Sequence, residues 1–274
     1  MKRFLTLILV LFIFSFLSPL ASSDETGRIH FINVGEGDSI LLETQGKAAL
    51  IDTGNLISGP RVVEYLKEKG IEKLNYLIIT HPHPDHIGGV FFILPMLKVE
   101  EIYDNGQALG GVRKTCAIYR WYEDLVRKRK NYAVLLSGNS LTLGNLTLEV
   151  LWPPETPSSS DFNAFSMVIM VRGDGFCCLL TGDLTISGER ELLKKGVRLK
   201  ADVLKVGHHG AEDAASEEFL KAVSPKIAVI SVDEDNYWGY PSEKVLERLK
   251  KAGVKVYRTD RDGDIVLKIA QISS

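Results

Sequence analysis

The densest group of chemically active side chains in this 274-residue sequence is a loop with three histidines and one aspartate within six positions: His81, His83, Asp85 and His86. The loop follows directly on the apolar run at residues 76–79, which predicts a buried strand that ends where the loop begins. Neutral imidazoles and a carboxylate are ligands that suit Zn²⁺ and similar divalent ions. Because scattered surface or core histidines seldom reach this density, the loop predicts a metal site.

Ligand-type side chains also follow three other predicted strands. Asp52 and Asp183 each end an apolar run, and the neighbouring pair His208 and His209 follows another. Loops at strand ends are where a rigid scaffold presents functional groups. Five of the six histidines lie in two such loops, so the four segments together form the candidate site.

Periodicity and turn residues divide the rest of the chain into short strands and helices that would position these loops. Predicted strands cover residues 29–34, 39–43, 48–52, 76–79, 166–171, 176–180, 202–206, 227–231, 254–258 and 265–269. Predicted helices cover residues 60–69, 85–94, 113–130, 186–195, 216–223 and 242–252. Two β-rich halves, each with helices and with no linker between them, predict two packed sheets with helices outside. We treat residues 24–274 as one domain.

The N-terminus has the pattern of a secretory signal peptide over residues 1–23. Lys2 and Arg3 precede a short apolar run at residues 4–17, and the small residues Ala21 and Ser23 provide a cleavage site. The run is shorter than the ~20 apolar residues that a membrane span needs. We therefore expect a secreted or extracytoplasmic protein with no stable membrane span after cleavage, and an uncleaved N-terminal anchor is the alternative.

The charge balance argues mildly against tight binding of nucleic acid. The chain has 33 basic and 35 acidic residues, and cleavage after Ser23 would remove two basic residues and no acidic one, which gives a formal charge of −4. Proteins that bind nucleic acids are more often basic. Bound divalent metals would add local positive charge to the site.

The motifs, in this order, resemble the metallo-β-lactamase superfamily, whose signature is His-x-His-x-Asp-His. More narrowly, the chain resembles the branch that contains the C-terminal domain of the ComEC/Rec2 DNA-uptake proteins. The narrower resemblance is carried by Asn-Val-Gly-Glu-Gly-Asp-Ser at residues 33–39, Ile-Asp-Thr-Gly at 51–54, Leu-Thr-Gly-Asp at 180–183, Asp-Val-Leu-Lys-Val-Gly-His-His-Gly at 202–210 and Arg-Thr-Asp at 258–260. It covers most of residues 28–270. It implies an α/β (α+β) fold, a four-layer αββα sandwich with a two-metal site between the sheet edges.

The resemblance also implies a role for each matching side chain. The implied metal ligands are His81 and His83 for the first ion, Asp85, His86 and His208 for the second, and Asp183 as a bridge. His209 is the alternative to His208, since either imidazole of the pair can turn inward. Asp85 would also act in catalysis through a hydrogen bond to the nucleophile, and Asp52 would orient a ligand histidine unless it only caps a strand end. The implied cofactors are two divalent metal ions, Zn²⁺ or Mn²⁺.

Two positions depart from the family pattern. Residues 87–207 contain no histidine, whereas lactamase-like members have one there on the first metal. The ComEC-like branch has an Asn/Ser segment instead, similar to residues 163–166 here, which makes Asn163 and Ser166 candidate substrate-binding residues. The first metal would keep three protein ligands, with room for water and substrate oxygens, and Mn²⁺ becomes a candidate occupant. Tyr240 stands where the branch has the histidine of Gly-His-Pro, either as a substrate-binding phenol or as part of a packed aromatic turn.

The function that the resemblance implies is an exported hydrolase, in which a hydroxide activated by a dinuclear metal centre attacks a phosphodiester, with DNA as the substrate. Local support comes from residues 113–130, where basic and aromatic side chains that can track a nucleic-acid backbone are interleaved. A solvated basic face of an amphipathic helix is the other interpretation. Two further functions stay open, a hydrolase of a lactone, lactam or choline-phosphate ester and a non-catalytic binding module. The missing first-metal histidine argues against hydrolysis of a lactam. The intact set of metal ligands argues against a non-catalytic binding module. A role in DNA uptake would need a separate partner.

Overall fold

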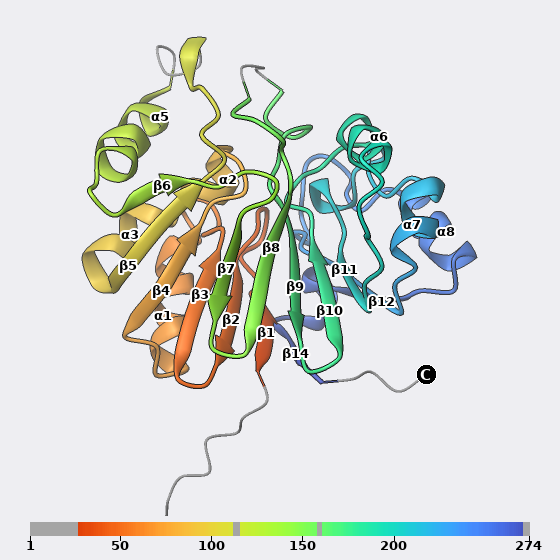
Figure 1. The fold of residues 1–274 in the computed structure, drawn as a ribbon, viewed down its shortest axis with the longest axis horizontal. Coiled ribbons are helices and arrows are strands. Elements are labelled where there is room, and N and C mark those ends of the chain that lie inside the picture. The colour runs from red at the N-terminus through yellow and green to blue at the C-terminus, as the bar shows by residue number, and fades with distance from the viewer. Residues whose placement is uncertain (1–26, 112–115, 158–160, 271–274) are drawn as a thin grey trace, which may run out of the picture.

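Two seven-stranded sheets pack face to face, with helices on both outer faces, in a computed structural model that describes residues 27–111, 116–157 and 161–270 (Figure 1). The predicted signal peptide at residues 1–23 lies outside the described residues. Within the described part of the chain, no helix is long and apolar enough to cross a membrane.

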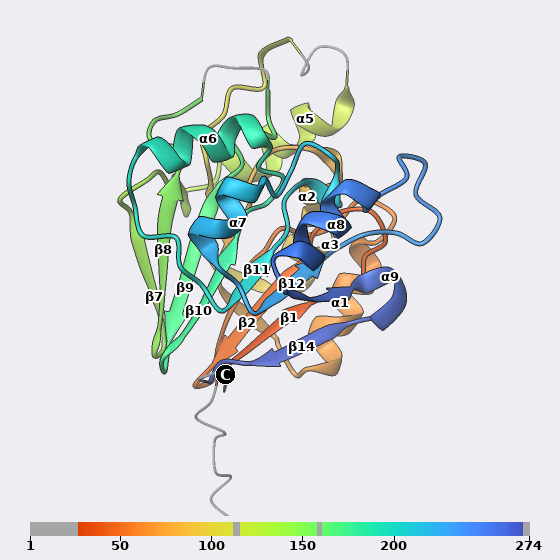
Figure 2. The same cartoon turned by 90° about the vertical axis from the view of Figure 1, so that its right-hand side faces the viewer.

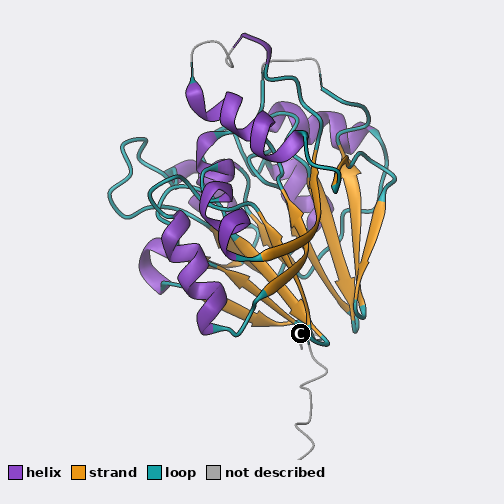
Figure 3. Ribbon diagram, turned by 90° about the vertical axis from the view of Figure 1, so that its left-hand side faces the viewer, coloured by secondary structure: helices purple, strands orange, loops and turns teal. Residues whose placement is uncertain are grey.

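The first sheet has the strand order β14-β1-β2-β3-β4-β5-β6. Its strands are β1 (Arg28–Phe31), β2 (Ile40–Thr44), β3 (Lys47–Ile51), β4 (Lys73–Ile78), β5 (Lys98–Asp104), β6 (Tyr132–Val134) and β14 (Ile265–Lys268). Its outer face carries α1 (Gly59–Glu68), α2 (Pro84–Ile87), α3 (Val90–Met96) and α5 (Ala117–Tyr122), which continues into the π-helical turn η1 (Glu123–Arg127) (Figure 3). Strands β3 to β6 run parallel, so their carboxyl ends lie at one edge of the sheet.

The second sheet has the order β13-β12-β11-β10-β9-β8-β7. Its strands are β7 (Ser140–Leu143), β8 (Leu146–Trp152), β9 (Val168–Gly173), β10 (Phe176–Leu180), β11 (Val203–Lys205), β12 (Ile227–Ile230) and β13 (Lys255–Arg258). The outer helices are α6 (Ile186–Lys194), α7 (Glu217–Val223) and α8 (Glu243–Lys251), and the short α9 (Thr259–Asp262) leads to β14 (Figure 2). Strands β10 to β13 are parallel, like β3 to β6 of the first sheet.

Three apolar layers hold the four-layer arrangement together, and each sheet contributes to two of them. On β2, Ile40 and Leu42 face the second sheet while Leu41 faces the helices, because successive side chains of a strand point to opposite faces. On β9, Ile169 faces the first sheet and Met170 faces the outer helices. The αββα sandwich expected from the sequence is confirmed.

The structure differs from the sequence-based expectation in the segment after the histidine loop. The single helix predicted at residues 85–94 is two helices, α2 and α3, joined at Gly88 and Gly89. A Cβ atom at Gly89 would lie 2.0 Å from the carbonyl oxygen of Thr53, so glycine lets the helix junction rest on the loop that follows β3. Strand β5 was not predicted, because charged residues alternate with its few apolar ones and no apolar run marks it.

Candidate metal centre

The four predicted ligand segments meet where strands of both sheets end. Asp52 follows β3 and the histidine loop follows β4 in the first sheet, and Asp183 follows β10 and the His208–His209 pair follows β11 in the second. Because each pair of strands is parallel, the carboxyl ends of its strands lie side by side. Packing of the two sheets brings the four loops to one site.

One group of side chains has three members, His81, His83 and Asp183. The Nε2 atom of His81 lies 3.0 Å from Nδ1 of His83 and 3.6 Å from Oδ2 of Asp183. Potential ligand atoms of the three residues all lie within 4.8 Å of one another. We call this group the three-ligand set.

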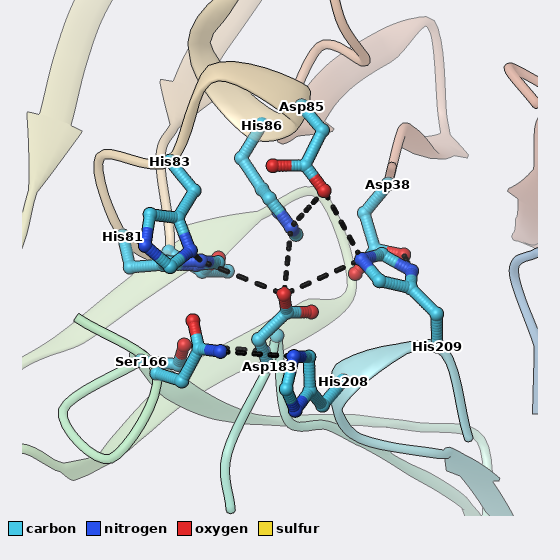
Figure 4. Close-up of polar contacts among 12 residues, drawn as sticks. Asp38, His81, His83, Asp85, His86, Ser166, Asp183, His208 and His209 are labelled. Atoms are coloured by element: carbon cyan, nitrogen blue, oxygen red, sulfur yellow. Dashed lines mark hydrogen bonds and ion pairs between the residues drawn. The ribbon is translucent and has the colours of Figure 1, made fainter. Parts of the chain in front are cut away.

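A second group has four members, Asp85, His86, Asp183 and His209, and we call it the four-ligand set. The Nε2 atoms of His86 and His209 each lie 3.3 Å from Oδ2 of Asp183. Nε2 of His209 is also 3.2 Å from Oδ2 of Asp85 (Figure 4). The same oxygen of Asp183 therefore faces both sets, which is the position of a bridging ligand.

The chemistry of these atoms fits divalent cations. Among the described residues, Nε2 of His86 and Nε2 of His209 are buried without a hydrogen-bond partner, and both lie 3.3 Å from Oδ2 of Asp183. Buried polar atoms are normally paired, and leaving one unpaired costs about 1–3 kcal/mol. Atoms that converge without partners and have metal-ligand chemistry are what a cation would satisfy.

The pKa values of His81 and His86 are shifted in opposite directions. Burial holds the pKa of His81 well below its usual value, which favours the neutral form that binds metals. Burial also acts to lower the pKa of His86, but the carboxylates of Asp183 and Asp52 outweigh it and hold that pKa well above its usual value. A divalent cation would supply the positive charge that the proton supplies at His86.

Asp52 fixes the orientation of the His86 ring through a hydrogen bond. Its Oδ2 atom accepts a hydrogen bond from Nδ1 of His86 at 2.8 Å, which leaves Nε2 free to face Asp183. The backbone N–H of Thr80 donates to Oδ1 at 2.7 Å, and the Thr80 hydroxyl donates to Oδ2 at 2.7 Å. The structure thus places Asp52 in the orienting position that the resemblance implies.

A buried lysine lies next to Asp183, on the side away from the two ligand sets. The Lys205 ammonium donates to the carbonyl oxygen of Gly182 at 2.9 Å, forms an ion pair with Asp38 and lies 3.8 Å from Oδ1 of Asp183. Both Lys205 and Asp38 are inaccessible to solvent. The sequence interpretation missed both residues, although a lysine between Leu204 and Val206 in an otherwise apolar strand was a visible signal.

The structure exchanges the roles predicted for the two neighbouring histidines. His209, not His208, faces Asp183 and Asp85, and its Nδ1 donates to the carbonyl oxygen of Ser231 at 3.0 Å. His208 instead contacts Asp213, with 2.9 Å between Nδ1 and Oδ1. The two residues lie in the 3₁₀ turn η2 (His208–Gly210) with left-handed φ angles of 47° and 51°, and this backbone sends their rings in different directions.

The ligands lie at the base of a cleft of about 600 Å³. Asn163 and Tyr240, two candidate substrate-binding residues, line this cleft, and the ring of Tyr240 lies 5.6 Å from that of His208. Ser166 does not line it: the side chain is buried, and its hydroxyl accepts a hydrogen bond from the backbone N–H of Asp183 at 3.1 Å. Ser166 therefore supports the backbone of Asp183 and is too deep to contact a substrate.

In the described part of the basic and aromatic stretch, residues 116–130, two tyrosines and one arginine are packed, whereas Arg120 and residues 128–130 are exposed. Tyr119 and Tyr122 are buried against the first sheet, and Arg127 pairs with the buried Asp104 at 2.8 Å. Trp121 is exposed. Arg113 and Lys114 lie outside the described residues. The packing favours the amphipathic-helix interpretation over a surface that stacks bases.

Comparison with known proteins agrees with this geometry. The family model described as "Metallo-beta-lactamase superfamily" matches residues 32–161. The ComE operon protein 3 of Bacillus subtilis is 33% identical over 272 residues, covering 91% of this chain and 34% of that protein. The chain belongs to the metallo-β-lactamase superfamily. Within the superfamily it falls in a ComEC/Rec2-like branch, since Recombination protein 2 of Haemophilus influenzae is also 30% identical over 269 residues, covering 96% of this chain and 31% of that protein.

Solved metallo-β-lactamase-fold structures share the architecture. YhfI from Bacillus subtilis superposes with a TM-score of 0.56 at 13% identity, covering 89% of this chain and 99% of that one. Igni18, a metallo hydrolase from Ignicoccus hospitalis, has a TM-score of 0.53 at 18% identity, covering 88% of this chain and 98% of that one. These likenesses show the fold. This metallo-β-lactamase-fold chain spans about a third of the length of its curated relatives and carries the domain of a metal-dependent hydrolase family.

Proposed function

We propose that the protein is a metal-dependent phosphodiesterase that hydrolyses DNA. The observation that carries the proposal is the single oxygen of Asp183 that faces both ligand sets, since this arrangement suits two cations placed side by side. Two divalent ions, when bound there, supply an acidified water and stabilise charge on the attacking and leaving oxygens of an in-line displacement. Two relatives carry the names "Competence protein ComA" and "Recombination protein 2", and these names favour DNA over other phosphodiesters.

The chain's own residues would bind and orient the substrate. The Asp85 side chain is part of the four-ligand set and lines the cleft, so its carboxylate can accept a hydrogen bond from the attacking water. Tyr240 also lines the cleft, and its hydroxyl can donate a hydrogen bond to a phosphate oxygen. Since the chain has a net charge of −2, attraction of a polyanion to this cleft would depend on the bound cations.

Full-length protein with Mn²⁺ or Zn²⁺ is expected to cleave single- or double-stranded DNA, and His83→Ala is expected to lower the rate at least about 100-fold. The reason is that loss of even an outer-shell partner of a metal site costs about 10–100-fold. His30→Gln is the matched control, because His30 is the one histidine outside the two ligand loops. The measurement is the rate of DNA cleavage on gels. DNA that stays intact with both metals would refute the nuclease activity.

We propose further that the site works outside the cytoplasm, because residues 1–23 have the pattern of a signal peptide. Expression in a bacterial host is expected to give a periplasmic or secreted product whose N-terminal residue is Asp24. Replacing Lys2 and Arg3 by glutamate is expected to retain the product in the cytoplasm. N-terminal sequencing of cell fractions is the measurement, and an uncut protein in the membrane fraction would indicate an anchor instead.

A further inference from the structure

The two ligand sets are unequal. The four-ligand set has two imidazoles and two carboxylates, whereas the three-ligand set has only His81, His83 and the shared Asp183. Divalent transition metals in proteins usually take four or more ligands. A cation in the three-ligand set would therefore have an incomplete protein shell unless another donor atom faces it.

Asn163 carries a candidate donor atom. Its Oδ1 atom is buried and, among the described residues, has no hydrogen-bond partner. The side chain lines the same cleft as His83 and Asp183. The adjacent Phe162 ring lies 5.2 Å from the ring of His83, so the segment of Asn163 packs directly against the three-ligand set.

The same segment is also tied to Asp183. The carbonyl oxygen of Asn163 accepts a hydrogen bond from the backbone N–H of Ser166 at 3.0 Å, and the Ser166 hydroxyl accepts one from the backbone N–H of Asp183 at 3.1 Å. Asn163 is thus fixed to both sides of the set, through Phe162 to His83 and through Ser166 to Asp183.

A chain of hydrogen bonds determines which way the amide of Asn163 points. The carboxylate of Asp213 lies 2.9 Å from Nδ1 of His208, so this nitrogen carries the proton and donates. Nε2 of His208 is then an acceptor, and it lies 3.0 Å from Nδ2 of Asn163, which donates to it. Because the two amide atoms of asparagine point to different sides, donation by Nδ2 turns Oδ1 away from His208.

We propose that Oδ1 of Asn163 is a ligand of the cation held by His81, His83 and Asp183, and that His208 and Asp213 are positioning residues that set its orientation. The inference rests on the proposed function only in requiring that the site binds two divalent cations. Two imidazoles, a carboxylate and an amide oxygen form a shell that suits Mn²⁺, since carbonyl oxygens are ligands of harder ions than zinc. His208, which does not face the metal, thus positions Asn163 instead of binding the cation.

Binding of Mn²⁺ by the full-length protein tests the proposal without an assay of activity. Competition with a chelator, followed by electron paramagnetic resonance of the bound ion, measures the stoichiometry and affinity of the two sites. Asn163→Ala is expected to keep one Mn²⁺ and to bind the second at least about 10-fold more weakly, as for a lost partner of a metal site. Asn163→Asp, which keeps an oxygen and adds charge, is expected to bind both ions at least as tightly as the wild type.

Two further variants separate positioning from folding. Asp213→Ala changes an exposed side chain, so the fold is not at risk, and it is expected to weaken only the second Mn²⁺. The double variant with Asn163→Ala is expected to be no weaker than Asn163→Ala alone, because the two residues act through one contact. Asn145→Ala is the matched control, since Asn145 bonds to Thr44 and Asp174 at hairpin turns and does not line the cleft.

Two Mn²⁺ ions bound by Asn163→Ala with wild-type affinity would overturn the proposal, and a raised KM for DNA in that variant would then assign Asn163 to substrate binding. A wild-type protein that binds no divalent cation would also overturn it. A wild-type protein that binds two Mn²⁺, loses one in Asn163→Ala and leaves DNA intact would support the ligand and refute only the proposed function.

Discussion

Asp183→Asn is expected to leave the protein with fewer than one tightly bound metal per chain and to lower hydrolysis about 100- to 10,000-fold. One oxygen of Asp183 faces both ligand sets, so the substitution removes a negative charge from both at once. Removing one partner from a buried charged group costs about 3–5 kcal/mol, and each 1.36 kcal/mol is a factor of ten. The measurements are metal per chain by mass spectrometry after dialysis, and the rate of DNA cleavage.

Asp174→Asn is the control for this experiment, because Asp174 lies in the turn between β9 and β10 and its carboxylate bonds to Asn145. The control is expected to keep the metal content and rate of the wild type. If Asp183→Asn retains two metals per chain, Asp183 does not bridge them.

Lys205→Met is expected to lower the free energy of unfolding by about 3–5 kcal/mol, the usual cost of leaving one member of a buried ion pair without its partner. The Lys205 ammonium is inaccessible and contacts the buried Asp38, so methionine would remove the cation in direct contact with that carboxylate and leave only His209 nearby, with Nδ1 3.8 Å from Oδ1 of Asp38. Urea unfolding of the metal-free protein, with chelator present, measures the effect of the lysine separately from that of the cations.

The double variant Lys205→Met with Asp38→Asn is expected to regain part of the loss, since it removes the unpaired charge. Lys221→Met, at an exposed position on α7, is the matched control and should stay within about 0.5 kcal/mol of the wild type. A loss below 1 kcal/mol for Lys205→Met would show that the carboxylates near the metals do not depend on this lysine.

The parts of the site that the sequence predicts well are those within one loop. His81, His83, Asp85 and His86 are close in space because six consecutive residues after one strand hold them. Asp183 was predicted through its place in a motif after another strand, and the packing of the two sheets brings it to the loop. In each case the strand end determines where the side chain lies, and a strand end is visible as an apolar run.

Other parts depend on backbone angles or on contacts that no local pattern records. Which of His208 and His209 turns inward is decided by two left-handed residues in succession, and either order satisfies the sequence pattern. Lys205 was not recognised, because the apolar residues around it predict a strand but do not show that an aspartate 167 positions earlier provides its partner. The role of Asn163 likewise depends on Asp213, which belongs to a different loop.

The pairing of β1 with β14 has a consequence for how this domain can be joined to other chains. Arg28 lies opposite Lys268, so the chain enters and leaves the described fold at adjoining points of one sheet. Along β1, β2 and β3 the register places Phe31, Ile40 and Ile51 at the other end of the strands, next to Asp52 and the cleft. Polypeptide attached before Arg28 or after Lys268 would leave the domain on the side remote from the cleft, and the two attached segments would lie next to each other. The domain therefore has the geometry of an insertable module, which a longer chain can carry while the mouth of the cleft stays open to large substrates.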